Sequence, residues 1–217
     1  MTIGVAVPCY SGHIGYITPL LDNIAQSTRK PEQVVISCSS SNEKGVQMFI
    51  YKDIHVRIWY SPERLNQATN RNRAASLLTT DLVTFIDADD LMHPKRLEFL
   101  CDVFEKRPDI AGVYHSYVHD HVSKRNDPFW EEPEINPLPY KIIKDPRSVG
   151  LRVECSTVEY PIHHAHVTLR RDVFARIRFN EDWNVYRLED SVYGATLVEN
   201  NVPLLYLNNQ LTRYIFN

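Results

Sequence analysis

The chain has 217 residues, of which 43% are hydrophobic and 24% are charged, and its formal net charge is −3. This length and composition are those of one globular domain with a hydrophobic core of its own. The slightly negative charge excludes the strongly basic surface that is typical of nucleic-acid-binding proteins, so we expect no nucleic-acid partner.

The cysteines and the apolar runs bear on where the protein functions. Cys9 and Cys38 end apolar runs typical of buried strands, and Cys101 and Cys155 lie far from them in the sequence. We therefore expect free thiols, as in a reducing compartment. No stretch approaches the about 20 apolar residues that cross a bilayer. A strand pattern begins at Ile3 and leaves no room for a signal peptide. These features favour a cytoplasmic location, for a whole protein or for a domain of a longer one.

Short apolar runs alternate with helical patterns through the first half of the chain. The predicted strands are Ile3–Val7, Val34–Ser37, Val56–Trp59, Leu82–Ile86 and Ile110–His119. The predicted helices are Ile14–Thr28, a short one near Val46–Tyr51, Asn66–Leu78 and Pro94–Arg107. The alternation predicts βαβ units and an α/β fold with a doubly wound, mostly parallel central sheet. Such sheets bind ligands at the carboxyl ends of their strands, here Pro8–Ser11, Ser37–Ser41 and Asp87–Asp90.

The second half has a different pattern. Asn126–Pro146 contains five prolines and is predicted to form a long loop or a lid over the cleft. After it, His164–Leu169 is predicted to be a strand, and the predicted helices are Arg171–Ile177 and Leu188–Asn200.

Three carboxylates follow the predicted strand Leu82–Ile86 within four positions: Asp87, Asp89 and Asp90. Ionised carboxylates this close repel one another unless a cation lies among them. Mg²⁺ and Mn²⁺ prefer oxygen ligands, and Mg²⁺ commonly binds one or two carboxylates together with substrate phosphates. The alternative is helix capping, for which Asp90 alone would suffice. The three acids together favour a metal site.

Arg71 lies on the same stripe of its predicted helix as Ala74 and Ala75. A guanidinium on a buried face needs an anionic partner. Either a nucleotide phosphate or an internal carboxylate would satisfy it, and the pattern does not separate the two.

Two further candidate groups lie in the second half. Glu189-Asp190 follows Trp183 and begins a helical pattern. A carboxylate in a cleft can act as a general base toward an acceptor hydroxyl, although acidic pairs are also common helix caps. His164 and His166 share one face of their predicted strand, where they could bind metal, contact phosphate, line an acceptor site or be structural residues.

Taken in order, these segments resemble a GT-A glycosyltransferase, most closely of family 2. The resemblance covers roughly Met1–Asn200 and is carried by Val5–Tyr10, Asn70–Asn72, the D-x-D motif in Phe85–Asp90, Arg170–Phe174, Arg178–Glu181 and Glu189-Asp190. The opening and the length are also similar to those of glycosyltransferase domains encoded by large algal viruses.

The resemblance implies one GT-A domain with a small acceptor-side subregion. Residues 1–120 would form the nucleotide-sugar-binding half, and residues 121–217 the lid and acceptor half. It implies a hexosyl- or deoxyhexosyltransferase that uses Mn²⁺ or Mg²⁺. The enzyme would move a sugar from a nucleotide-diphosphate donor, with UDP-sugar favoured, to a hydroxyl of a glycan or glycoprotein, inverting the anomeric configuration.

The resemblance also assigns roles to residues. Asp190 would be the catalytic base, with Glu189 as the second candidate. Asp87 and Asp89 would bind the metal, for which His164 and His166 are further candidate ligands. The residues expected to border the nucleotide are Pro8, Cys9, Tyr10, Ser37, Ser39, Asn66, Arg71, Asp87, Ala88 and Asp89.

Two departures from the family pattern leave alternatives open. Ser37–Ser41 stands where the family usually has acidic residues, one of which contacts uracil, so a guanosine or thymidine donor is possible. The spacing before Glu189-Asp190 is loose, which leaves a retaining mechanism open. The competing functions are a sugar nucleotidyltransferase, although Pro8–Ser11 is not a glycine-rich basic loop, and a non-catalytic module that binds sugar nucleotides or glycans.

Overall fold

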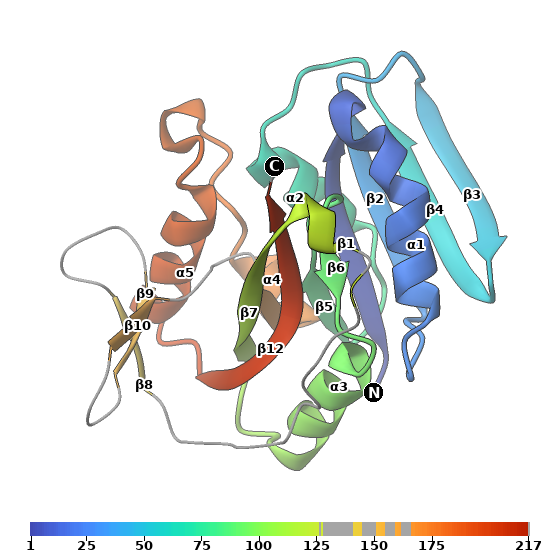
Figure 1. The fold of residues 1–217 in the computed structure, drawn as a ribbon. Helices are drawn as coiled ribbons and strands as arrows, with labels where there is room; N and C mark the ends of the chain where they lie inside the picture. Colours follow the sequence, from blue (N-terminus) through green and yellow to red (C-terminus); the bar gives the residue numbers. More distant parts are fainter. Residues whose placement is uncertain (126, 128–140, 145–150, 155–158, 162–165, 217) are drawn as a thin grey trace.

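The computed structural model describes residues 1–125, 127, 141–144, 151–154, 159–161 and 166–216. A nine-stranded sheet forms the centre of the fold (Figure 1). In spatial order its strands are β3 (Gly45–Tyr51), β4 (Ile54–Tyr60), β2 (Gln33–Ser39), β1 (Ile3–Tyr10), β5 (Leu82–Phe85), β11 (Val167–Arg170), β7 (Gly112–His121), β12 (Leu204–Phe216) and β6 (Leu91–Met92).

The helices and a second, smaller sheet complete the described part. The helices are α1 (Ile17–Ala25), α2 (Gln67–Ser76), α3 (Arg96–Lys106), α4 (Arg171–Arg176) and α5 (Glu189–Glu199). The smaller sheet contains β10 (Glu159–Pro161), β9 (Leu151–Glu154) and β8 (Lys141–Lys144), and β8 and β9 contact α5. No helix in the described ranges is long and apolar enough to cross a membrane.

Four strands of the predicted nucleotide-binding half form a parallel block within the central sheet. Strands β4, β2, β1 and β5 run parallel to one another, as the predicted βαβ units require. The rest of the sheet is mixed, because β11 lies antiparallel between β5 and β7, and β12 pairs parallel with β7. The two predicted halves of the chain therefore share one sheet. The boundary between residues 120 and 121 stays a prediction.

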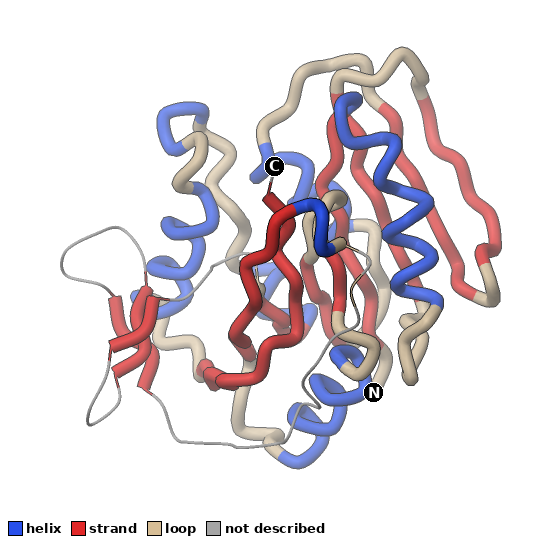
Figure 2. The backbone as a smooth tube through the Cα atoms, viewed as in Figure 1, coloured by secondary structure: helices blue, strands red, loops and turns tan. Residues whose placement is uncertain are grey.

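Helices cover both faces of the sheet (Figure 2). Strand β1 is buried on both sides: Val5 and Val7 belong to the core on the α1 and α3 face, and Ala6 belongs to the core on the α2, α4 and α5 face. A strand buried on both faces is expected to be a continuous apolar run, as this one is. Burying such aliphatic side chains contributes about 1.5–3 kcal/mol for each of the larger ones.

The predicted short helix near Val46–Tyr51 is wrong, because these residues form the edge strand β3. It pairs antiparallel with β4 through a two-residue turn, Lys52-Asp53, in which both residues have positive φ, 46° and 70°. Two positive φ angles are those of the hairpin turn that suits the twist of the strands. The segment is mostly exposed at the sheet edge, so its apolar run lacks the alternation that identifies a half-buried strand.

Smaller differences concern the ends of elements. Helix α1 starts at Ile17, after a 3-10 turn over Ser11–Tyr16, and not at Ile14. Most of the predicted lid, Asn126–Pro146, lies outside the described residues, apart from β8 at its end. Three of the four cysteines are free and buried, as expected, and Cys155 lies outside the described residues.

Candidate active site

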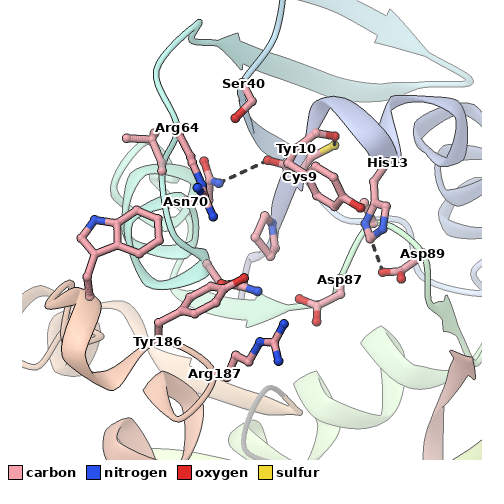
Figure 3. Close-up of a pocket in the computed structure, with 15 residues that line it drawn as sticks. Cys9, Tyr10, His13, Ser40, Arg64, Asn70, Asp87, Asp89, Tyr186 and Arg187 are labelled. Atoms are coloured by element: carbon pink, nitrogen blue, oxygen red, sulfur yellow. Dashed lines mark hydrogen bonds and ion pairs between the residues drawn. The ribbon is translucent and has the colours of Figure 1, made fainter.

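A cavity of about 570 Å³ lies at the carboxyl ends of β1 and β5, where ligands of parallel sheets are expected (Figure 3). Six of the residues predicted to bind nucleotide or metal line it: Pro8, Cys9, Tyr10, Asp87, Ala88 and Asp89. The apolar strands place these residues there, because the chain leaves the sheet directly after Tyr10 and Phe85.

The three clustered aspartates have different roles. Asp87 and Asp89 face the cavity with side chains that are 27% and 33% exposed. Asp90 is buried, and its Oδ1 accepts a hydrogen bond from the backbone N–H of Ile215 at 3.0 Å. Burial and the charge of Asp87 hold the pKa of Asp90 well above its ordinary value. The capping alternative for Asp90 is therefore wrong, because this carboxyl fixes the end of β12.

The two exposed carboxylates suit a divalent cation. Burial raises the pKa of Asp89, the nearby His13 opposes this, and the charge of Asp87 adds to the rise. His13 Nδ1 lies 3.6 Å from Asp89 Oδ1. An added cation would stabilise both ionised carboxylates, and a hard ion accepts two such oxygen ligands with substrate phosphates completing its shell.

Of the two histidines predicted as further metal ligands, His166 is not part of the cavity wall. His166 is buried and stacks on His115, with ring centroids 5.3 Å apart, and His164 lies outside the described residues. Within the ranges that the structure describes, no three His, Cys, Asp or Glu side chains form a metal-binding group. A metal at this site would depend on Asp87 and Asp89.

Arg71 pairs with two internal carboxylates. Its Nη1 donates to Glu189 Oε1 at 2.7 Å, and its Nη2 donates to the Asp87 oxygens at 3.0 and 3.2 Å. Burial disfavours the charge, but Asp87, Glu189 and Asp190 outweigh it and raise the pKa of Arg71. The internal ion pair, which the sequence left open, is present. Arg71 does not line the cavity and reaches it only through Asp87.

Three predicted nucleotide contacts lie behind the cavity wall. Asn66 caps α2 by accepting from the Thr69 N–H, and Ser37 and Ser39 are fully buried. Ser37 donates to Asn70 Oδ1, and the Asn70 amide donates to Ser39 and to the backbone oxygen of Cys9. These bonds hold the ends of β1 and β2 against α2. Ser40 and Asn70 line the cavity instead.

The acidic pair begins α5, as predicted. Glu189 is buried and held by Arg71, whereas Asp190 is half-buried and its Oδ1 accepts from the Ser191 N–H at 2.7 Å. Neither residue is in the cavity lining. Because Glu189 is committed to an ion pair, Asp190 is the better candidate for a base.

Sequence reasoning missed the wall of the cavity that Trp183, Tyr186 and Arg187 form. Trp183, Tyr186 and Arg187 lie on the turn before α5 and face the cavity. The guanidinium of Arg64 lies 5.5 Å from the centroid of the Trp183 ring, and that of Arg187 lies 5.6 Å from the Tyr186 ring. The only sequence signal was a cluster of aromatic residues ahead of an acidic pair. The other missed lining residues are His13, Arg64, Leu65, Gln67 and Asn70, whereas Ser40 lies within the predicted segment Ser37–Ser41.

Comparisons with known proteins identify glycosyltransferases that are similar to this chain. The chain is 24% identical over 191 residues to the amylovoran biosynthesis glycosyltransferase AmsB of Erwinia amylovora, with 83% of this chain and 59% of that protein covered. It is 26% identical over 180 residues to the glucosyl-dolichyl phosphate glucuronosyltransferase of Haloferax volcanii, with 82% and 55% covered. The chain thus spans less than two thirds of these relatives.

Solved structures share the fold. TarS 1–349 of S. aureus in complex with UDP superposes with a TM-score of 0.68 at 17% identity, covering 100% of this chain and 61% of that one. The complex of the same protein with UDP-GlcNAc gives 0.70 at 16% identity, covering 100% and 59%. The profile of "Glycosyl transferase family 2" matches residues 4–178, which is most of the chain. The chain therefore belongs to glycosyl transferase family 2.

Proposed function

We propose that this protein transfers a sugar from a nucleotide-diphosphate donor, with a UDP-sugar favoured, to a hydroxyl of a glycan or glycoprotein acceptor. One observation carries the proposal. The end of β1, Pro8–Tyr10, and the carboxylates Asp87 and Asp89 meet in one cavity at the carboxyl ends of parallel strands, in a chain of this family. Solved neighbours bind UDP and UDP-GlcNAc, which supports the same class of donor here.

The proposal assigns different parts of the nucleotide-sugar donor to different residues of the cavity. Pro8, Cys9 and Tyr10 would border the nucleobase, with Ser40 and Asn70 beside them. Asp87 and Asp89 would hold Mn²⁺ or Mg²⁺. When bound, such an ion neutralises negative charge on a departing nucleotide, as a Lewis acid does.

The acceptor chemistry requires a base near the anomeric carbon. Asp190, on the first turn of α5, would remove the proton of the acceptor hydroxyl as its oxygen attacks. Attack from the side opposite the departing nucleotide inverts the anomeric configuration. Glu189 and Asp87 would not take this proton, because both carboxylates already accept hydrogen bonds from the guanidinium of Arg71.

Nucleotide-sugar binding and sugar release test the proposal. A panel of UDP-, GDP- and dTDP-sugars would be screened for thermal stabilisation with Mn²⁺ and with EDTA, since selective binding raises the melting temperature by mass action. The best donor would then be followed for release of its sugar in a single turnover. Selective binding with sugar release supports a transferase. Binding without any cleavage would leave a non-catalytic module, and no binding of any nucleotide sugar would refute the proposal.

A further inference from the structure

Arg187 has an unusual backbone conformation at the edge of the cavity. Its φ angle is 71°, in the left-handed region that arginine rarely occupies. Strained residues of this kind persist where the surrounding structure holds them, and they cluster at ligand sites. The conformation turns the chain from the Trp183–Val185 turn into α5 and leaves the side chain on the cavity wall.

The segment around Arg187 is fixed at both ends. The Leu188 N–H donates to the Val185 oxygen at 2.8 Å, and Glu189 is held by the buried Arg71. On the other side, the Asn66 amide donates to the Glu181 oxygen at 2.8 Å, which ties the segment to α2. The backbone at Arg187 is therefore held in place by the fold.

The guanidinium of Arg187 has room for an anion. It points into the cavity on the side of Asp87 (Figure 3). Within the described residues it forms no ion pair with a carboxylate, and its one recorded contact is with the ring of Tyr186. Asp87 is already compensated by two hydrogen bonds from Arg71. No ion pair among the described residues therefore explains why this exposed arginine has a strained backbone conformation.

The neighbouring groups indicate which anion fits. The planar fork of a guanidinium matches two oxygens of a phosphate, and the Asp87–Asp89 edge is where the proposed function places the donor diphosphate. Arg64 also lines the cavity, but it lies beside Ser40 at the other end, away from Asp87 (Figure 3). Resting on the proposed function, we propose that Arg187 binds the diphosphate of the nucleotide donor directly, as a cationic contact supplied from the acceptor half of the chain.

Such a contact has a consequence that a metal alone does not give. Arginine keeps its charge at all working pH values, so the diphosphate retains one positive partner when no divalent ion is bound. The negative charge that grows on the diphosphate during transfer strengthens this contact, which therefore favours the departing nucleotide over the intact donor.

The test compares ligands that differ only in phosphate. Binding of uridine and of UDP would be measured by ligand-observed NMR and calorimetry, with EDTA and with Mn²⁺, for the wild type, Arg187→Gln and Arg187→Lys. We expect Arg187→Gln to weaken UDP about tenfold, the loss of one charge-assisted hydrogen bond, in both conditions. Uridine affinity should not change, and Arg187→Lys should lie between.

Two further variants separate binding from folding and from net charge. Arg187→Gly should weaken UDP as Arg187→Gln does, yet melt at or above the wild-type temperature, because glycine adopts positive φ without strain. Arg176→Gln, an exposed change of the same charge on α4, should leave UDP affinity unchanged.

The outcomes discriminate clearly. Equal UDP affinity in Arg187→Gln and the wild type overturns the inference, as does an equal loss for uridine and UDP. Normal UDP binding with loss of transfer to acceptor would also overturn it, by placing the arginine on the acceptor. A wild type that binds neither UDP nor any nucleotide sugar refutes the proposed function itself.

Discussion

Replacing Arg71 by methionine should destabilise the fold strongly. The guanidinium is 3% exposed and makes hydrogen bonds to Glu189 and to Asp87. Methionine keeps the volume but leaves Glu189, which is 7% exposed, as a buried charge without its partner. Removing one member of a buried ion pair costs about 3–5 kcal/mol. In a chain of this size each kcal/mol lowers the melting temperature by about 2–4 °C, so we expect a fall of roughly 6–20 °C.

Urea unfolding followed by circular dichroism would measure the change, with Glu189→Gln and the double variant completing a cycle. The double variant should be more stable than Arg71→Met by about 1 kcal/mol or more, because it no longer contains the buried, unpaired carboxylate of Glu189. Arg107→Met is the matched control: its ion pair with Asp109 is exposed and should cost less than about 1 kcal/mol. A loss for Arg71→Met no larger than that of the control, or a double variant no more stable than Arg71→Met, would refute the reasoning.

Three aspartates give further predictions. Asp89→Asn should abolish the increase in UDP affinity that Mn²⁺ produces, and an undiminished increase in calorimetry would remove Asp89 from the metal site. Asp190→Asn should retain UDP binding but lower transfer by about 10²–10⁴-fold, as expected for loss of a general base; full activity would place the base elsewhere. Asp90 has a raised pKa in the folded protein, so it contributes its full stability below the unfolded value of about 3.9 and loses it as pH rises through the folded pKa. Asp90→Asn should therefore flatten the decline of stability that sets in as pH rises above about 4 in urea titrations, and an unchanged slope would contradict this.

The lining residues at the ends of β1 and β5 could be predicted, because the apolar pattern of the sequence indicates where these strands end. Buried parallel strands are continuous apolar runs, and the residues that follow them must lie at one edge of the sheet. This placed Pro8–Tyr10 and Asp87–Asp89 together correctly. The same rule was less precise after β2, where the strand continues to Ser39 and only Ser40 turns into the cavity. The length of β2 decides which serine lines the cavity, and the sequence pattern does not predict strand length accurately.

The wall of the cavity at Trp183, Tyr186 and Arg187 could not be predicted, because tertiary hydrogen bonds hold the segment that leads into it. The Asn72 amide donates to the Phe179 oxygen and to the Glu181 carboxylate, and Asn66 holds the Glu181 backbone. None of these bonds has a local sequence pattern, since each joins α2 to a segment more than 100 residues away. The exposed edge strand β3 was misread for a related reason, because its partner strand and not its own periodicity makes it a strand.

Arg71 connects the two sides of the site through one buried side chain. It does not line the cavity, yet it bonds Asp87 after the end of β5 and Glu189 at the start of α5. The candidate base Asp190 follows Glu189 directly, so the position of the base is tied to the position of the D-x-D carboxylate. A displacement of one must strain bonds to the other, because a guanidinium is planar and its donors have fixed directions. The proposed metal-binding carboxylate and the proposed base are thereby held in register by a residue that does not line the cavity.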